Sequence, residues 1–386
     1  MVPLLLAVVV VVMLLPVSLC FPHAVSSNSS VAGVVGVTYA MNTPGLPHPK
    51  KVVEALVAAG VTRVLLVDPY PDGVAAFNNT DIVLTIAINN SYIQSLATNV
   101  TMTFLWLGDN IILPNIKIEA ISVGYDVFSS ENLHLAGDLL QAIQNLHEGM
   151  SEILQGNISI TTANSFDLIT PAFPPSAAEF NRSVAELYLR PLLQFLDGAG
   201  FPFFISLYPF KLYRAGAILG ENTGIAAFEY AEGQHLTDPK TGLVYYNIFD
   251  AMVDATVAAM AKLGYADVPL VVSGTGWPSE GGLNEPEASI LYAGEYNEGL
   301  VSKLNMRLGT PARPETTPVT FIYALFDDPR ETGAESERNW GIWTMDMQQK
   351  YVIDFTPSKA SGGRTTSSLH RSAVAAVTAF VLLCLA

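Results

Sequence analysis

Eight short runs of β-branched and aromatic residues alternate with longer segments of helical periodicity along most of this chain. The runs are Val34–Tyr39, Val64–Val67, Ile82–Ile88, Ile118–Val123, Ile158–Thr162, Phe203–Leu207, Leu270–Ser273 and Phe321–Phe326. Continuous apolar strands, each followed by a helix, predict a parallel sheet covered on both faces. Eight such units in about 320 residues favour a closed (β/α)8 TIM barrel. We expect a single domain over residues 25–355.

An open doubly wound sheet is the alternative architecture. The turn after the first run reads Tyr39-Ala40-Met41-Asn42 and lacks a glycine-rich phosphate loop. A nucleotide-binding sheet would carry such a loop at this turn. The sequence therefore favours the barrel.

Three segments between the runs have clear helical patterns. Lys50–Ala59 stops at Gly60, which is a common residue directly after a helix. Ala177–Leu196 is expected to bend at Pro191. Its predicted inner face consists of Val184, Leu187, Tyr188, Leu192 and Phe195. The helix predicted over Phe249–Leu263 has Met252, Ala255, Ala259 and Leu263 facing inward.

Both ends of the chain are apolar and predict processing. Val2 to Leu19 carries no charge and precedes small residues, which favours a signal peptide over residues 1–24 rather than a membrane span. At the other end, a stalk over residues 356–361 begins a stretch rich in Ser, Thr and Gly that runs to Arg371, and a polar spacer and an apolar tail follow the stalk. That order is typical of a glycosylphosphatidylinositol (GPI) signal, with attachment at Ser361 or Gly362 and residues 362–386 removed. A short tail anchor is the alternative.

Charge and cysteine content limit the partners of the processed chain. Removal of both ends keeps all 35 acids and loses Arg364 and Arg371, which leaves 17 of the 19 bases and a net charge of −18. Such a surface repels nucleic acid and anionic lipid, so the membrane is reached through the GPI lipid. The two cysteines, Cys20 and Cys384, leave with the ends, so no disulfide is expected. We expect a secreted monomer on the outer face of the plasma membrane, facing the cell wall.

Asn-x-Ser/Thr sequons support passage through the secretory pathway. They stand at Asn28, Asn78, Asn89, Asn99, Asn157 and Asn181. Glycosylation of some of them is expected on a secreted chain.

Chemistry in a barrel of this kind lies at the carboxyl ends of the strands. The residues there include Tyr39, Asp68, Asn89-Asn90, Tyr125-Asp126, Asn164-Ser165, Tyr208, Gly274 to Trp277, and Asp327-Asp328. Aromatic rings beside amides and carboxylates suit a carbohydrate, because sugar C–H faces pack on rings and hydroxyls need donors and acceptors. Tyr39, Tyr208, Trp277 and Trp340 could each instead belong to the core. Six scattered histidines without an HxH or HxxxH pair predict no metal, and no cofactor motif is present.

Several longer sequence motifs resemble motifs of plant endo-1,3-β-glucanases of glycoside hydrolase family 17. They are Leu46-Pro47, Pro174-Pro175-Ser176-Ala177, Asn247 to Ala255, Thr275-Gly276-Trp277-Pro278-Ser279, Gly309-Thr310-Pro311, and Ser336 to Gly341. The resemblance covers about residues 33–355. It implies a (β/α)8 barrel, a groove for linear β-1,3-glucan such as callose or laminarin, and a retaining mechanism with two glutamates.

Both catalytic glutamate positions implied by the resemblance are changed. The family's Val-Gly-Asn-Glu-Val word, which carries the acid/base, reads here Val123-Gly124-Tyr125-Asp126-Val127. The family's Ser-Glu-(Thr/Ser)-Gly-Trp-Pro-Ser word, which carries the nucleophile, begins here Ser273-Gly274. A retaining glycosidase needs both carboxylates about 5 Å apart. Asp126 is one methylene shorter than glutamate and Gly274 has no side chain, so hydrolysis is predicted to be lost or severely impaired.

Other positions of the resemblance are kept only in part. Tyr39, Tyr208 and Glu337 match it, and Asp328 keeps the strand-eight carboxylate, whereas Glu331 stands where the family has lysine. The family's strand-two Arg-(Leu/Ile)-Tyr word reads Leu65-Leu66-Val67. Tyr125 and Trp277 complete, with Tyr39 and Tyr208, the aromatic residues expected to bind sugar.

Three functions stay open at this point. The first is a cell-surface protein that binds β-1,3-glucan without cutting it efficiently. The second is an active endo-1,3-β-glucosidase that uses Asp126 with Asp328 or Glu337, for example by inversion. The third is a surface protein that contacts other proteins and no sugar, which an apolar patch on the outer helices would favour.

Overall fold

Eight parallel strands close into a barrel in the computed structural model, which describes residues 33–111, 115–153, 158–216, 226, 228 and 234–356. The strands follow one another around the barrel in the order β1-β12-β11-β8-β5-β4-β3-β2. Their bounds are β1 Val35–Ala40, β2 Arg63–Val67, β3 Val83–Ile88, β4 Lys117–Tyr125, β5 Ser159–Ser165, β8 Phe203–Ser206, β11 Leu270–Thr275 and β12 Val319–Ile322. The predicted (β/α)8 TIM barrel is confirmed, and each of the eight runs overlaps a barrel strand, although the last run, Phe321–Phe326, shares only Phe321 and Ile322 with β12.

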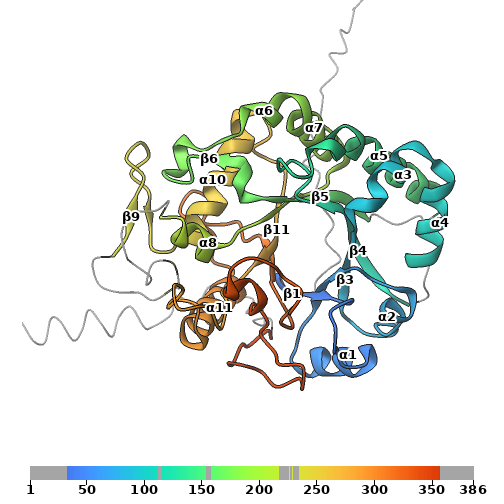
Figure 1. Ribbon diagram of the computed structural model, residues 1–386. Helices are drawn as coiled ribbons and strands as arrows, with labels where there is room; N and C mark the ends of the chain where they lie inside the picture. The colour runs from blue at the N-terminus through green and yellow to red at the C-terminus, as the bar shows by residue number, and fades with distance from the viewer. Residues whose placement is uncertain are drawn as a thin grey trace, which may run out of the picture. The chain divides into compact units, whose positions relative to one another are not determined.

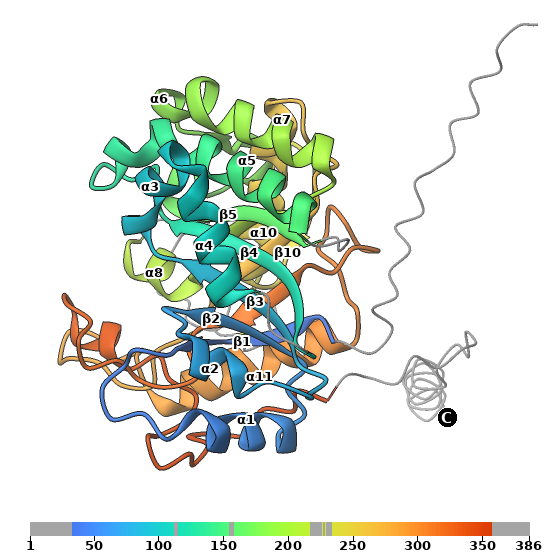
Figure 2. The same cartoon turned by 90° about the vertical axis from the view of Figure 1, so that its right-hand side faces the viewer.

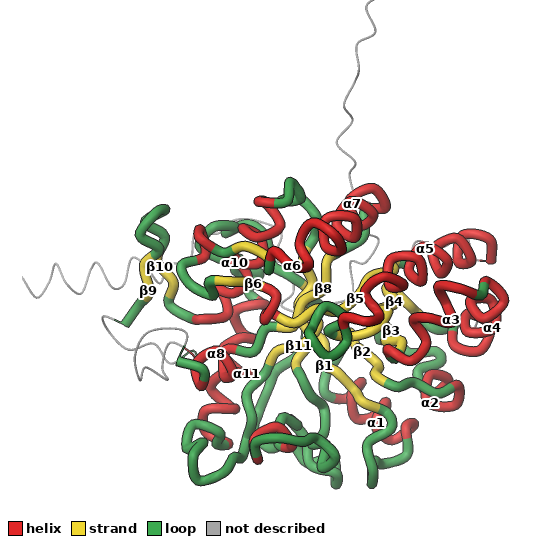
Figure 3. Tube along the Cα trace, turned by 45° about the horizontal axis from the view of Figure 1, so that its top comes forward, coloured by secondary structure: helices red, strands yellow, loops and turns green. Residues whose placement is uncertain are grey.

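Helices surround the strands in an outer ring (Figures 1 and 2). The longer ones are α1 Pro49–Ala58, α4 Val100–Asn110, α5 Ala136–Ile153, α7 Arg190–Ala199, α10 Ile248–Lys262 and α11 Ile290–Asn305. Shorter ones are α2 Pro71–Ala75, α3 Ile93–Thr98, α6 Arg182–Val184 and α8 Pro209–Arg214, with 3-10 turns η1 Asn90–Tyr92, η2 Leu133–Leu135, η3 Phe166–Leu168, η4 Pro175–Ala177 and η6 Glu335–Arg338. Figure 3 shows the strands in the centre and the helices outside them.

Two small antiparallel sheets decorate the connections between barrel strands. One pairs β6 Ile169–Thr170 with β7 Glu179–Phe180, and the other pairs β9 Leu236–Thr237 with β10 Val244–Tyr245. The eighth barrel strand differs from the expected strand-then-helix unit. After β12 the described chain forms the short turn η6 and extended segments up to Thr356, with no α-helix among them.

The helix predicted over Ala177–Leu196 is wrong in its start and in part of its inner face. It begins only at Arg182, and a π-helical turn, η5 Ala185–Leu189, precedes Pro191 in α7. Proline lacks the N–H that an α-helix would use, and a π turn lets the backbone absorb this. The wider turn changes which side chains face the barrel: Leu187 is 66% exposed, whereas Leu189 is fully buried.

The inside of the barrel is filled in layers by residues that alternate along the strands. A lower layer contains the apolar side chains Leu65, Ala120, Ala163, Phe204, Val271 and Phe321. Nearer the carboxyl ends of the strands the inward residues are smaller and more polar, among them Thr38, Ala87, Ser122, Ser206 and Ser273. Small side chains in the upper layer leave space at this end of the barrel.

Several predictions concern residues outside the described ranges. They are the signal peptide over 1–24, most of the stalk over 356–361, Ser361, the removed segment 362–386, and the sequons Asn28 and Asn157. Within the described ranges, none of the helices is long and apolar enough to cross a membrane.

Candidate active site

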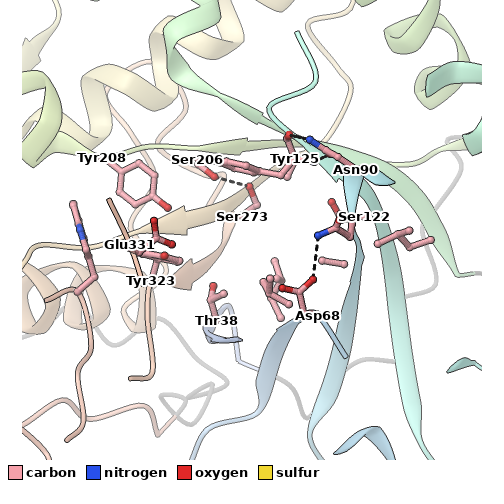
Figure 4. A pocket seen from close by; sticks show the side chains of 18 of the residues that line it. Thr38, Asp68, Asn90, Ser122, Tyr125, Ser206, Tyr208, Ser273, Tyr323 and Glu331 are labelled. Carbon is pink, nitrogen blue, oxygen red and sulfur yellow. Dashed lines mark hydrogen bonds between the residues drawn. The ribbon is translucent and has the colours of Figure 1, made fainter. Parts of the chain in front are cut away.

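A cavity of about 520 Å³, called here the main cavity, opens at the carboxyl ends of the barrel strands. Seven barrel strands contribute to its wall, and a residue directly after β12 completes it. The contributions are Thr38 of β1, Leu65 of β2, Ala87 of β3, Ser122 of β4, Ala163 of β5, Ser206 of β8 and Ser273 of β11, with Tyr323 directly after β12. Figure 4 shows the side chains of Thr38, Ser122, Ser206, Ser273 and Tyr323 around the cavity.

A smaller cavity of about 110 Å³, the side cavity, shares part of this wall. Glu331, Glu337 and Trp340 line both cavities, and Asp328 and Arg330 line the side cavity. The site therefore consists of the main cavity and the smaller side cavity, and the chain after β12 supplies acidic residues to both.

Gly274, to which the resemblance assigns the nucleophile position, lies on β11 where the register with β8 and β12 shifts. A Cβ atom built on it would lie 2.7 Å from the hydroxyl oxygen of Tyr208 and 3.2 Å from Ser206 Oγ. Ordinary Cβ contacts are longer than 3.4 Å. The space beside Gly274 is thus occupied by the Tyr208 hydroxyl, and a larger side chain requires that ring to move.

Hydroxyl groups form a cluster next to Gly274. Ser206 Oγ lies 3.1 Å from Ser273 Oγ and also hydrogen-bonds the hydroxyls of Tyr125 and Tyr208. Although Tyr125 is 49% exposed, desolvation at its hydroxyl raises its pKa to about 12. Burial likewise raises the pKa of Tyr208 well above its usual value, and that of Tyr323 is raised for the same reason. All three phenols stay protonated at neutral pH, so they offer hydrogen bonds and no nucleophilic oxyanion.

Asp126, the predicted acid/base residue, follows β4 directly but lines neither the main cavity nor the side cavity. Its backbone has a left-handed φ of 50°, and its N–H donates to the carbonyl oxygen of Ala163 at 2.9 Å. Burial raises the pKa of its carboxyl to about 6, and the neighbouring Asp167 adds to this, against hydrogen bonds from Ser165 and Ser129. Tyr125, the preceding residue, faces the main cavity instead (Figure 4).

The carboxylates in the two cavities are partly neutralised by cations. Arg330 holds Asp328 with two hydrogen bonds, from Nε to Oδ1 at 2.9 Å and from a terminal nitrogen to Oδ2 at 2.6 Å. This contact lowers the pKa of Asp328. Lys211 Nζ lies 2.9 Å from Glu337 Oε2 and 5.3 Å from the centre of the Tyr208 ring.

Glu331 is a cavity residue that the strand-end rule did not find. Desolvation, and the nearby carboxylates of Asp328 and Glu337, raise the pKa of its carboxyl. Glu331 stands several residues beyond the end of β12. In the sequence, the one sign that it belongs to the site was that it occupies a position where the family has lysine. Lys211, Ser206, Ser273 and Tyr323 were missed as well. The serines lie inside predicted strands, where inward-facing alternation would have been the signal.

Tyr39 and Trp277, both predicted to bind sugar, belong to the core and line neither cavity. Tyr39 is 1% exposed and packs edge-on against Phe326. Trp277 is fully buried, and its Nε1 donates to the carbonyl oxygen of Glu287 at 2.8 Å. The predicted aromatic residues that do line the main cavity are Tyr125 and Tyr208.

The four sequons within the described ranges carry exposed asparagines, namely Asn78, Asn89, Asn99 and Asn181. Of these, Asn89 lines the main cavity. The described residues contain no group of three or more His, Cys, Asp or Glu side chains arranged to hold a metal ion.

Comparison with known proteins places this geometry in a family. The family model described as "Glycosyl hydrolases family 17" matches residues 35–355. "Glucan endo-1,3-beta-glucosidase 13" of Arabidopsis thaliana is 33% identical over 340 residues, which cover 87% of this chain and 66% of the relative. "Glucan endo-1,3-beta-glucosidase 14" of the same plant is 32% identical, over 83% of this chain and 81% of the relative. The chain thus spans about two thirds of the first relative's length.

Solved structures agree with the sequence comparison. CJP38, "a beta-1,3-glucanase and allergen of Cryptomeria japonica pollen", superposes with a TM-score of 0.78 at 31% identity, covering 84% of this chain and 99% of CJP38. A plant β-glucan endohydrolase superposes with a TM-score of 0.75 at 28% identity, covering 83% of this chain and all of that one. On the family match, the sequence identity and the shared barrel, this chain belongs to the glycosyl hydrolases of family 17.

Proposed function

We propose that this protein binds β-1,3-glucan in the main cavity and does not hydrolyse it by the retaining route. The supporting observation is the space beside Gly274, where the Tyr208 hydroxyl lies 2.7 Å from the position of a Cβ atom and residue 274 supplies no carboxylate. A covalent glycosyl-enzyme requires a nucleophile under the anomeric carbon. The neutral phenols and serines that surround Gly274 instead supply paired donors and acceptors, which suit sugar hydroxyls.

The glucan ligand comes from the relatives. The printed names of the curated relatives and of CJP38 describe proteins that act on β-1,3-glucan. Tyr208 and Tyr125 offer rings to the cavity, and Ser206, Ser273 and Glu337 offer polar groups. This combination of apolar faces and hydrogen-bonding groups is what a pyranose ring needs.

The alternative of an active inverting enzyme requires two carboxylates that face each other across the bond to be cut, about 6.5–9.5 Å apart. Asp126 lines neither cavity, whereas Asp328 lies in the side cavity under its two bonds from Arg330. This placement disfavours the pair. Hydrolysis of laminari-oligosaccharides to α-anomeric products would establish this alternative in place of the proposal.

An outer groove of about 300 Å³ is the observation that bears on the protein-contact alternative. Apolar side chains from the start of α5 and from the η5–α7 segment line it, including Leu140, Leu187 and Tyr188. The outer groove is smaller than the main cavity and carries few polar groups. Sugar binding in the main cavity is therefore better supported than a protein contact at the groove.

Binding and hydrolysis can be tested on the same preparations. We expect the purified protein to bind laminarihexaose by calorimetry while releasing no reducing sugar from laminarin. Ala87→Leu, which enlarges a side chain of the cavity wall, should weaken binding by about tenfold or more, since about 1.4 kcal/mol of lost contact suffices. The matched control is Ala75→Leu, at an exposed position of α2. Laminarin turnover by the wild type, or binding unchanged in Ala87→Leu, would contradict the proposal.

We also propose a location on the outer cell surface, which rests on the sequence pattern at the two ends. A phosphatidylinositol-specific phospholipase should release the protein from intact cells into the medium. Retention of the protein on treated cells, with release of a known GPI-anchored marker, would contradict this location.

A further inference from the structure

Asn89 places the acceptor atom of a glycosylation sequon in the wall of the main cavity. The residue follows β3 directly, and its side-chain Nδ2 lies 3.3 Å from Oδ1 of Asp68, another wall residue. Figure 4 shows Asp68 at the lower rim of the chamber. Any group attached to this nitrogen therefore starts at the cavity opening.

The local structure is compatible with a sugar on this nitrogen. Asn89 and Ser91 are both exposed, and Asn89 Oδ1 accepts a hydrogen bond from the Ser91 N–H at 3.0 Å, which leaves Nδ2 free of the turn itself. The 3.3 Å contact with Asp68 is longer than an ordinary hydrogen bond, so losing it costs little. Asp68 keeps a closer partner, because Asn42 Nδ2 donates to its Oδ2 at 2.6 Å.

The segment that carries Asn89 is fixed to the barrel. Asn90 Nδ2 donates to the carbonyl oxygen of Tyr125 at 3.0 Å, and the Tyr125 N–H donates back to Asn90 Oδ1 at 2.8 Å. These two bonds tie the turn after β3 to the end of β4. The attachment point of a glycan on Asn89 would consequently stay fixed at the cavity opening, because the turn that carries it is held to the barrel.

The other sequons in the described part of the chain lie elsewhere. Asn78 follows α2, and Asn99 and Asn181 cap the helices α4 and α6. None of these three lines the main cavity, the side cavity or the outer groove. They therefore provide matched controls for the effect of glycosylation as such.

We propose that an N-linked glycan on Asn89 covers the main cavity and so controls access of glucan to it. In the modification, Asn89 Nδ2 forms a bond to C1 of the first sugar of a lipid-pyrophosphate-linked oligosaccharide. The C1–O bond to the pyrophosphate breaks, the lipid pyrophosphate leaves, and Nδ2 gives up one proton. Because an N-linked glycan is bulky, it narrows the entrance of the cavity in molecules modified at this site. The role in glucan access rests on the function proposed above.

The test uses the full chain secreted from a eukaryotic host, with Ser91→Ala to remove the sequon and keep the Asn89 side chain. Thr101→Ala, which removes the sequon at Asn99, is the control. Glycopeptide mass spectrometry measures occupancy of Asn89, and calorimetry measures laminarihexaose binding. A Val67→Cys substitution in the cavity wall, added to each variant, reports access independently of sugar binding through its rate of maleimide labelling.

We expect Asn89 to carry a glycan. Ser91→Ala should be labelled by maleimide about tenfold faster than the wild type and Thr101→Ala, and it should bind laminarihexaose about tenfold more tightly than they do. An unmodified Asn89, or an occupied Asn89 with equal labelling in Ser91→Ala, overturns the inference. Faster labelling in Ser91→Ala without glucan binding by any variant supports the glycan cover and overturns the proposed function, so the two failures are distinguishable.

Discussion

At the scale of single residues, the space available beside Gly274 is limited by a neighbouring ring. The Tyr208 hydroxyl oxygen lies 2.7 Å from where a Cβ atom of residue 274 would be, and Ser206 hydrogen-bonds that hydroxyl. Adding a carboxylate at Gly274 is therefore insufficient to rebuild a reacting group, because the tyrosine must also move.

This coupling predicts a double-mutant cycle. Gly274→Ala should destabilise the fold by about 1–3 kcal/mol, as overpacking does. In a Tyr208→Phe background the clashing oxygen is absent, so the same substitution should cost less by about 1 kcal/mol or more. Urea denaturation of the four proteins measures both values. Strictly additive effects would show that Tyr208 does not occupy this space in solution.

The carboxyl of Asp126 makes a prediction about pH. Its pKa is raised from 3.8 to about 6, so folding favours the protonated form. This stabilisation is fully present below pH 3.8 and is lost as the pH rises through about 6. Relative to Asp126→Asn, which stays neutral, the wild type should lose roughly 1 kcal/mol of unfolding free energy between pH 4 and 7, after discounting for partial exposure. An NMR titration of the Asp126 carboxyl with a midpoint near 4 would contradict this.

The sequence predicted which strand ends form the site but not which side chains face it. Asp68, Asn89, Tyr125 and Tyr208 are all at the cavity, because strand ends meet at one mouth of a barrel. Asp126 lies outside because left-handed backbone at Gly124 and Asp126 interrupts the alternation of side chains at the end of β4. Tyr39 and Trp277 are buried by long-range packing, against Phe326 and Phe210 respectively, which local patterns do not contain.

At the scale of elements, apolar periodicity located the strands and most helices, and it failed where the backbone left its regular geometry. The predicted face of the segment that became α6, η5 and α7 assumed one continuous α-helix. The π turn over Ala185–Leu189 exposes Leu187 and buries Leu189. Such a turn depends on how the chain enters α7 through Pro191 and on packing against the barrel, so periodicity alone could not predict it.

Two truncations distinguish the observed face from the predicted one. Leu189→Ala should lower the unfolding free energy by about 2–5 kcal/mol, since it removes a fully buried leucine. Leu187→Ala should change it by less than about 0.5 kcal/mol, because that side chain is 66% exposed. Thermal or urea denaturation gives the comparison. Equal losses would mean that the helix is regular and the π turn is absent.

At the scale of the whole molecule, one buried carboxylate links three distant segments. Asp254 on α10 accepts hydrogen bonds from the Tyr245 hydroxyl and the Ala312 N–H, each at 2.9 Å, and from the Thr310 hydroxyl. These donors belong to β10 and to the loop that leads into β12. The family motifs around Asn247 and Gly309 thus stabilise the fold and do not line the main cavity or the side cavity.

Loss of this link should destabilise the barrel without affecting the cavity. Asp254→Ala leaves three donors without their acceptor, which predicts a loss of about 3 kcal/mol in unfolding free energy. Asp197→Ala, at an exposed position of α7, is the control and should be close to neutral. Laminarihexaose affinity of the folded Asp254→Ala protein should equal that of the wild type. A reduced affinity would show that the network also shapes the site.

The wall of the main cavity is assembled from residues of seven barrel strands and from Tyr323 directly after the eighth, and several of these side chains, such as those of Thr38, Ser122 and Ser273, are short. Thr38, Ser122, Ser206 and Ser273 belong to neither of the two apolar clusters that pack the barrel and its helices. A single substitution at one of these four positions is therefore expected to change the lining of the main cavity without removing a member of either apolar cluster. The cavity lining and the apolar packing of this barrel therefore depend on largely different residues, so the lining can vary while the fold is kept.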